Sequence, residues 1–202
     1  MTDIALVIVI SLGLYLGFIR PWQVRWGATD AEVARRLPGD DVVKNPSFNA
    51  TRAITIQARP EAVWPWILQI GSKRAGWYSL DWIDNAGIPS TERIIPELQH
   101  MNLGDFVPMT PDGKNGMWVK ACETNRTMLW WDKKANSTWL WRLEPIDQHQ
   151  TRLITRLRVR YAWTSIWLLY YLLQDVGDIV MMRKCMQGIK RRAERLAAQP
   201  AQ

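Results

Sequence analysis

Five short segments in the middle of the chain are rich in Trp, Val, Leu and Thr and are separated by turn sequences. They cover residues 104–109, 116–124, 127–133, 137–144 and 151–163. The turns include Pro111-Asp112-Gly113 and Pro145-Ile146-Asp147, which are typical of chain reversals between strands. Adjacent strands joined by short turns pair antiparallel. The pattern therefore predicts an antiparallel sheet in this half of the chain.

The last of these strands has the clearest two-faced pattern. One face carries Leu153, Thr155, Leu157, Val159, Tyr161 and Trp163, and the other carries Arg152, Arg156, Arg158 and Arg160. Successive side chains of a strand point to opposite faces of the sheet. We expect the first face to be core and the second to be a strongly basic surface.

Helices are predicted on both sides of this run of strands. Residues 52–58 alternate as a strand, and residues 60–68 then read as a helix with proline at its first position and a bend at Pro65. Residues 76–87 predict a short helix ending at Gly87. Residues 178–197 repeat apolar side chains at spacings of three and four, which predicts a long amphipathic helix packed on the sheet.

The first twenty residues predict a membrane anchor. Ile4 to Ile19 are uncharged and mostly apolar, which is at the short end of what spans a bilayer. The bulky pair Pro21-Trp22 follows the run, so an uncleaved anchor fits better than a secretory signal. Arginines follow the run, and the positive-inside rule then predicts a single-pass protein of the cell membrane with its C-terminal domain in the cytoplasm. The alternative is a buried N-terminal core helix.

The rest of the chain predicts one domain. Residues 21–50 form a linker in which Thr29 and Glu32 make the capping box of a short helix. Residues 51–198 form the folded domain, and residues 199–202 a disordered tail. Within the domain, the aromatic segment 161–173 is too short to span a bilayer and lacks a polar face, so it is either an interfacial segment or a second buried helix.

The net charge of +7 lies entirely in the last quarter of the chain. Residues 1–151 hold 16 basic and 16 acidic side chains, whereas residues 152–202 hold 10 basic and 3 acidic ones. No nucleic-acid-binding motif accompanies this charge, so we expect an anionic membrane surface as the partner and no nucleic acid. The residues expected at that surface are Arg156, Arg158, Arg160, Trp163 and Trp167. The alternative is a solvated outer face.

Cysteine and histidine positions indicate neither a disulfide nor a metal site. Cys122 and Cys185 are far apart, and His100 and His149 have no partner at catalytic or metal spacing. We therefore expect no metal and no cofactor.

Four segments resemble one superfamily of proteins. They begin at Trp26, Pro60, Gly76 and Met182 and read Trp-Gly-Ala-Thr-Asp, Pro-Glu-Ala-Val-Trp-Pro-Trp, Gly-Trp-Tyr-Ser-Leu-Asp-Trp and Met-Arg-Lys-Cys-Met-Gln-Gly-Ile-Lys-Arg-Arg-Ala-Glu. The chain is similar over about residues 22–197 to the helix-grip fold of the START and birch-pollen-allergen superfamily (SRPBCC), in a bacterial polyketide cyclase/dehydrase-like branch. The resemblance implies an α+β fold, with a curved antiparallel sheet wrapped around a long C-terminal helix and a hydrophobic cavity between them.

The 13 tryptophans and eight methionines could line such a cavity. The candidate ligand-binding residues are Trp77, Tyr78, Trp82, Trp118, Trp130, Trp139, Trp141, Met182 and Met186. The alternative for each is an ordinary core position. Strand parity adds that Trp130 and Trp131 cannot both face inward, nor can Leu140 and Trp141.

Catalytic candidates are few. Cyclase-type relatives place an acid, base or hydroxyl group in the cavity, and Tyr78, Asp81, Arg93 and Glu97 are the possible equivalents. Asp81 beside aromatic residues would suit general acid or base work if it were buried, and the alternative is a helix cap at the surface.

Three functions remain open on the sequence. The first is membrane-anchored binding or transfer of an apolar small molecule or lipid. The second is a polyketide cyclase or aromatase-like enzyme of the cyclase/dehydratase type, and we expect a non-enzymatic protein more than an enzyme. The third is an accessory subunit of a larger membrane complex.

Overall fold

Six antiparallel strands form one sheet in the order β1-β6-β5-β4-β3-β2. The computed structural model describes residues 6–7, 10, 13–161 and 168–198, and for residues 168–176 it describes the backbone only. The strands are β1 (Phe48–Ile56), β2 (Phe106–Pro108), β3 (Gly116–Glu123), β4 (Thr127–Trp131), β5 (Ser137–Pro145) and β6 (Thr151–Val159). The predicted strands are therefore confirmed, each within a few residues of the expected ends.

The first and last strands of the chain lie side by side. β1 and β6 pair over nine residues, from Phe48 opposite Val159 to Ile56 opposite Thr151. The other neighbours are joined by hairpins, and a register shift between Val119 and Ala121 interrupts the β3–β4 ladder. Such bulges bend a strand and increase its twist. The result is a curved sheet in which both ends of the domain meet at one edge.

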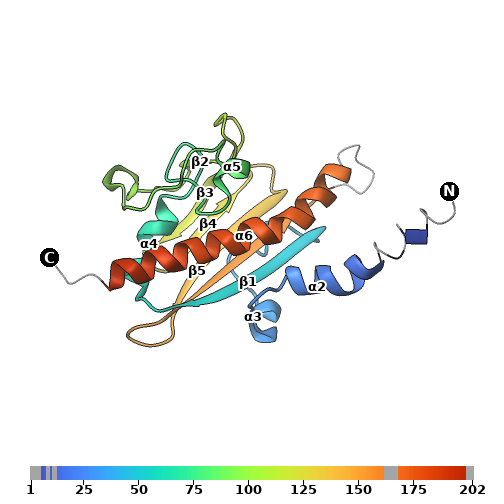
Figure 1. Cartoon of the computed structure of the whole chain (residues 1–202), viewed down its shortest axis with the longest axis horizontal. Coiled ribbons are helices and arrows are strands. Elements are labelled where there is room, and N and C mark those ends of the chain that lie inside the picture. Colours follow the sequence, from blue (N-terminus) through green and yellow to red (C-terminus); the bar gives the residue numbers. More distant parts are fainter. Residues whose placement is uncertain (1–5, 8–9, 11–12, 162–167, 199–202) are drawn as a thin grey trace.

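One long helix, α6 (Leu168–Ala197), crosses a face of the sheet diagonally (Figure 1). It begins ten residues earlier than predicted, so residues 168–173 of the aromatic segment form its first turns. Residues 162–167 of that segment, with Trp163 and Trp167, lie outside the described residues. α4 (Pro60–Leu68) packs beside α6 and has proline at its first position and Pro65 inside, as predicted.

The remaining helical elements are short. The predicted helix at 76–87 is reduced to α5 (Asp81–Asp84), because Gly76 and Tyr78 both adopt positive φ angles that a helix does not tolerate. Pro96–Leu98 form a 3-10 turn, η2. In α3 (Asp30–Ala34), Thr29 and Glu32 make the predicted capping box.

Strand parity divides the apolar residues into two layers. Trp130, Trp141 and Leu153 face α6 and belong to the main core, whereas Leu129 and Leu140 lie on the outer face in a second cluster with Leu37. Trp130 and Trp131 therefore face opposite ways, as do Leu140 and Trp141, which confirms the parity prediction.

The outer face of β6 differs from the expectation of an exposed basic surface. Residues 27–43 lie over it, and Arg156 is only 3% exposed, with an ion pair to Asp40 at 2.6 Å. Its guanidinium also donates to Thr51 and to the carbonyls of Glu32, Val33 and Arg35. The expected membrane-surface role of Arg156 is thus wrong, because its charge is already neutralised and its donors are occupied inside the fold.

Two neighbouring arginines are held by the same segment. Arg158 is largely buried and contacts Asp40 and the carbonyl of Val43, and Arg152 pairs with Glu32 at 2.7 Å. Arg160 is exposed and donates to Asn136. Of the three arginines predicted for a membrane surface, only Arg160 therefore remains available to solvent.

The N-terminal segment leads away from the sheet (Figure 1). We call its described residues between Leu6 and Trp22 the N-terminal arm; it includes the π-helical turn η1 (Tyr15–Ile19) and continues into α2 (Arg20–Gln23). Within the described residues, no helix is both long and apolar enough to cross a bilayer. The predicted anchor covers residues 1–20, of which residues 1–5, 8–9 and 11–12 lie outside the described residues.

Candidate functional site

Four tryptophans form a continuous aromatic wall between the sheet and α6. Trp77 stacks on Trp139 with ring centroids 5.8 Å apart and planes 6° apart, and Trp139 stacks in turn on Trp141 at 5.1 Å. Trp130 meets both strand tryptophans edge-on, at 5.5 and 6.0 Å. Offset and edge-to-face pairs are the favourable aromatic geometries, so the wall is rigid.

Three buried indole N–H groups near this wall have no hydrogen-bond partner among the described residues. They belong to Trp66, Trp130 and Trp141. By contrast, Trp77 donates to Ser72 at 3.1 Å and Trp139 to Thr155 at 2.9 Å. An unsatisfied buried donor costs about 1–3 kcal/mol. The interior therefore holds donors that an acceptor-bearing molecule could satisfy.

The α6 side of the interior is apolar and rich in methionine. Met182, Met186 and Ile189 are buried, as predicted for the methionines, and they face the aromatic wall together with Cys185. Burial raises the pKa of the Cys185 thiol, so the group stays protonated and acts as a small apolar side chain. Methionines adapt to irregular shapes, which suits a surface that packs against variable partners.

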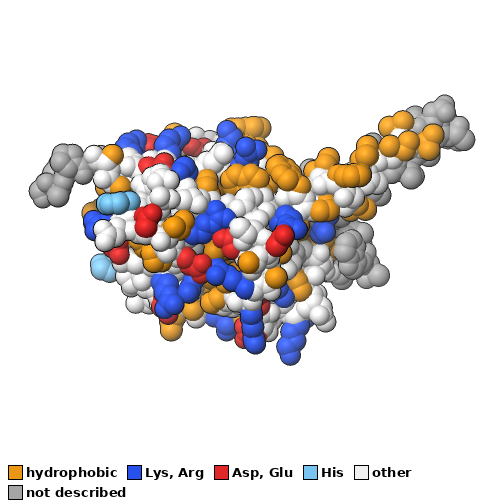
Figure 2. Space-filling model, turned by 90° about the horizontal axis from the view of Figure 1, so that it is seen from below, with side chains coloured by type: hydrophobic (Ala, Val, Ile, Leu, Met, Phe, Trp, Pro, Cys, Tyr) orange, Lys and Arg blue, Asp and Glu red, His pale blue; other side chains and the backbone are white. Residues whose placement is uncertain are grey.

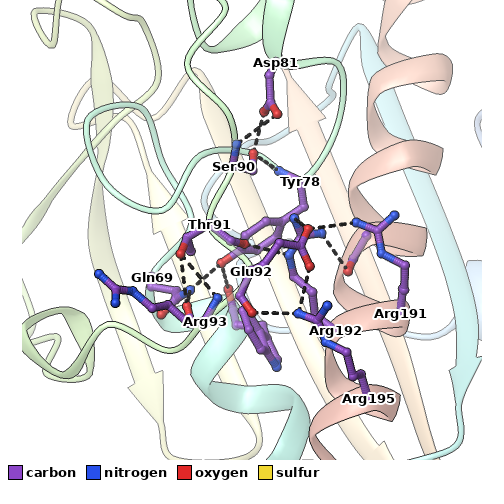
Figure 3. Close-up of polar contacts among 12 residues, drawn as sticks. Gln69, Tyr78, Asp81, Ser90, Thr91, Glu92, Arg93, Arg191, Arg192 and Arg195 are labelled. Carbon is purple, nitrogen blue, oxygen red and sulfur yellow. Dashed lines mark hydrogen bonds and ion pairs between the residues drawn. The ribbon is translucent and has the colours of Figure 1, made fainter.

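Tyr78 links the loop before α5 to α4 and α6 (Figure 3). Its hydroxyl accepts from Gln69 at 2.9 Å and donates to the carbonyl of Trp66 at 3.3 Å. The guanidinium of Arg192 lies 4.4 Å from its ring centroid. Desolvation raises the pKa of Tyr78 far above its usual value, so the phenol remains neutral.

The other predicted catalytic residues have structural roles or face solvent. Asp81 accepts hydrogen bonds from the backbone N–H and the hydroxyl of Ser90 (Figure 3). These two bonds hold the loop after α5 in place. Glu97 is exposed on η2, and the side chain of Arg93 is also exposed. Among the described residues, no three His, Cys, Asp or Glu side chains come together as a metal site. The described interior thus offers a neutral hydroxyl and indole donors. Asp84 on α5 adds a half-buried carboxyl whose pKa is raised by burial.

Two predicted ligand-binding residues lie away from the wall. Trp82 is 75% exposed on α5. Trp118 is on the outer face of β3. Its ring centroid lies 5.0 Å from that of Phe106 and 4.7 Å from Nζ of Lys133. The structure brings together the other predicted lining residues, namely Trp77, Tyr78, Trp130, Trp139, Trp141, Met182 and Met186.

Sequence reasoning missed several residues of this region. Trp66 and Gln69 come from the buried end of α4, and Gln69 also accepts from the backbone of Ile95, joining three segments. Glu92 receives three arginines of α6. A helical pattern could have placed Trp66 inward, but no local signal pairs Glu92 with residues a hundred positions later.

Comparisons with known proteins give fold likeness only. No protein-family model and no curated protein matches the chain. Among solved structures it is similar to a conserved protein of unknown function from Enterococcus faecalis, at 14% identity and a TM-score of 0.47, with 78% of each chain covered. A protein from Thermobifida fusca gives 11% identity and 0.46, covering 76% of this chain and 97% of that one.

One similar structure carries a descriptive name. It is a "Polyketide_cyc-like" protein from Corynebacterium glutamicum, at 16% identity and a TM-score of 0.38, covering 77% of this chain and 92% of that one. With TM-scores below 0.5 and identities below 25%, these likenesses carry no activity to this chain. The function must be argued from its own residues.

Proposed function

We propose that this protein is a membrane-anchored helix-grip protein of the SRPBCC type that binds an apolar small molecule or lipid between its sheet and α6. The observation that carries the proposal is the N-terminal arm. Its side chains are apolar and at least half exposed at Leu6, Val7, Ile10, Leu14, Leu16, Phe18, Ile19 and Trp22. Figure 2 shows these apolar side chains projecting from the body of the domain.

An exposed apolar row of this length needs a partner. Each fully buried Leu or Phe side chain contributes about 1.5–3 kcal/mol relative to exposure, so several together give strong association with a lipid phase. Only Asp3 and Arg20 bear side-chain charges between residues 1 and 20. The bilayer of the cell membrane, with the domain on the cytoplasmic side, is the partner that we propose.

The interior supports binding of an apolar molecule. An aromatic wall, adaptable methionines and a small number of polar groups are the usual composition of a small-molecule pocket. The indole N–H groups of Trp66, Trp130 and Trp141 have no hydrogen-bond acceptor among the described residues. An apolar ligand with a carbonyl or ether oxygen would satisfy them, which fits a lipid or a polyketide-like molecule.

The cyclase alternative has one supporting observation, the buried hydroxyl of Tyr78. Its raised pKa makes it a hydrogen-bond donor and not a proton-transfer group at neutral pH. The described partners of its hydroxyl are the Gln69 amide and the Trp66 carbonyl, and neither takes up a proton at neutral pH, so binding is the better proposal. An accessory subunit of a membrane complex would use the same arm against protein instead of lipid.

Vesicle flotation tests the role of the arm. The full-length protein is reconstituted with phosphatidylcholine vesicles, alone or with anionic lipid, and compared with the double variant Leu14→Asp/Phe18→Asp. A carboxylate within the apolar layer costs about 2.5–3.5 kcal/mol, so we expect at least a tenfold drop in the bound fraction. Trp82→Asp, which changes an exposed aromatic residue outside the arm, is the matched control and should float like the original protein.

Native mass spectrometry tests the interior. Protein extracted in mild detergent should carry an apolar adduct, and Trp139→Ala, which opens the centre of the aromatic wall, should lose it. Urea unfolding of the same variant shows whether the domain still folds. An original protein without any adduct, together with failure to take up added lipid or polyketide-like probes, would reject the binding proposal.

A further inference from the structure

A polar pocket lies between α6 and the loop that carries residues 78–92. Its volume is about 520 Å³. Its walls comprise residues of the loop, including Tyr78, Asp81 and Glu92, and residues of α6, including Lys184, Arg191 and Arg192. None of the four tryptophans of the aromatic wall lines this pocket. Of the predicted lining residues of the apolar site only Tyr78 borders both, so the pocket is a distinct polar site.

Helix periodicity explains how α6 forms one side of the pocket. Gln187 and Gly188 lie three and four residues after Lys184 and four and three residues before Arg191, so the four residues share one face of the helix. Gly188 lets this face approach the loop closely. A methyl group there would meet the backbone oxygen of Tyr78 and lie 2.6 Å from its Cβ.

A single carboxylate in this region receives three arginines (Figure 3). Glu92 contacts Arg191 at 3.1 Å and Arg192 at 2.5 Å through Oε1, and Arg195 at 2.8 Å through Oε2. Arg192 is only 3% exposed and is fixed further by the carbonyls of Thr91 and Gly188. The buried guanidinium is therefore held rigidly at the pocket.

The charges of the pocket do not balance. Three cations, Lys184, Arg191 and Arg192, and two carboxylates, Asp81 and Glu92, line the pocket, which leaves a net charge of +1. Both oxygens of Asp81 are already engaged by Ser90. Lys184 makes no hydrogen bond or ion pair with any described residue, so its three donors are available.

We propose that this pocket binds a phosphate group carried by a small molecule. A phosphate monoester bears a charge of about −1.5 to −2 at pH 7, so the net positive charge of the pocket attracts it. Lys184 and Arg191 would bind its oxygens from α6, with Arg192 beneath them as a fixed positive charge. The site does not depend on the arm or on the apolar interior, so either proposal can fail alone.

Isothermal titration of the full-length protein in non-ionic detergent tests the site, with inorganic phosphate as the first probe. We expect saturable binding that weakens with added salt. The double variant Lys184→Gln/Arg191→Gln should raise the Kd at least tenfold. The control is Arg183→Gln, which removes the same type of charge from the neighbouring position of α6. Because Arg183 contacts Trp26 and does not line the pocket, the Kd of this variant should stay within twofold of that of the original protein.

Two further probes distinguish the source of the phosphate. Glycerol phosphate represents soluble phosphomonoesters, and a short-chain phosphatidic acid below its micelle concentration represents lipid headgroups; whichever competes better with inorganic phosphate identifies the source. A Kd of about 10 mM corresponds to a binding free energy of roughly −3 kcal/mol. If phosphate does not saturate the protein up to about 10 mM, the proposal is overturned. An unchanged Kd in the double variant, with its unfolding midpoint also unchanged, would overturn it equally.

Discussion

Arg52 on β1 forms an ion pair with Asp178 on α6, with 2.5 Å between Nη1 and Oδ2. The Arg52 side chain is 1% exposed, and its Nε also donates to the carbonyl of Gln23 at 2.8 Å. One buried guanidinium therefore joins the sheet, the long helix and the base of the N-terminal arm. This arrangement fixes where the arm leaves the domain.

We expect Arg52→Met to destabilise the domain by about 3–5 kcal/mol, because it removes a buried ion pair to α6 and the hydrogen bond to the Gln23 carbonyl. Urea unfolding followed by tryptophan fluorescence measures the change. Arg36→Met removes an exposed arginine that follows α3 and should change stability by less than about 0.5 kcal/mol. A similar small effect for both variants would show that Arg52 does not hold these elements together.

Protonation of Glu32 should weaken the packing of residues 27–43 over β6, so the stability of the domain depends on pH. The hydrogen bond from Arg152 lowers the pKa of Glu32 to about 2. A carboxyl whose pKa is lowered by folding stabilises the protein above its unfolded-state pKa, and this contribution is lost as the pH falls through the folded-state value. We therefore expect stability to decline between about pH 4.5 and pH 2.

The variant Glu32→Gln separates this contribution from other acid effects. The difference in unfolding free energy between the original protein and the variant should be largest at pH 6–7 and should shrink steadily as the pH is lowered toward about 2. Glu97→Gln, on an exposed carboxyl of η2, is the control. A Glu32→Gln difference that stays constant with pH would contradict the assignment.

The local rules that succeeded on this sequence act within one element. The capping box of Thr29 and Glu32, the proline start of α4 and the parity of Trp130 follow from backbone geometry, and each is found in the structure. The arginines of β6 show where such rules stop. A charged strand face predicts solvent, and only the long-range packing of residues 27–43 shows that Arg156 is buried.

The candidate site divides in the same way. Parity and helical spacing placed Trp141 and Met186 inside, since each depends on the element that carries it. The exposure of Trp82 and the arginine cluster around Glu92 depend on the path of the loop between residues 78 and 92. Positive φ angles at Gly76 and Tyr78 redirect this loop, and nothing in a helical pattern reveals them.

Two tryptophans of the aromatic wall should respond differently to loss of the indole N–H. Trp139→Phe removes the hydrogen bond to Thr155, worth about 0.5–1.5 kcal/mol beyond the loss of packing. Trp130→Phe removes a donor that has no partner among the described residues, so relief of that unsatisfied group offsets part of the lost packing.

We therefore expect Trp139→Phe to be the more destabilising variant, although Trp130 is the more deeply buried residue. Urea unfolding of the two variants in parallel gives the comparison. The reverse order would mean that the Trp130 N–H has a partner, which in this interior would be a bound molecule or a water. Repeating the measurement after lipid extraction distinguishes a lipid from water.

Two glycines of α6 provide the last test, because the same substitution should have opposite effects. Gly188→Ala places a methyl group against the backbone of Tyr78 and must separate α6 from the loop, at a cost of about 1–3 kcal/mol. Gly177→Ala meets nothing within 4 Å and should stabilise the helix by up to about 1 kcal/mol. Thermal unfolding of both variants measures the difference. Since Gly188 also lines the polar pocket, its variant should lose phosphate binding as well, whereas Gly177→Ala should retain it; equal stability and equal binding in the two variants would contradict the close packing of α6 on Tyr78.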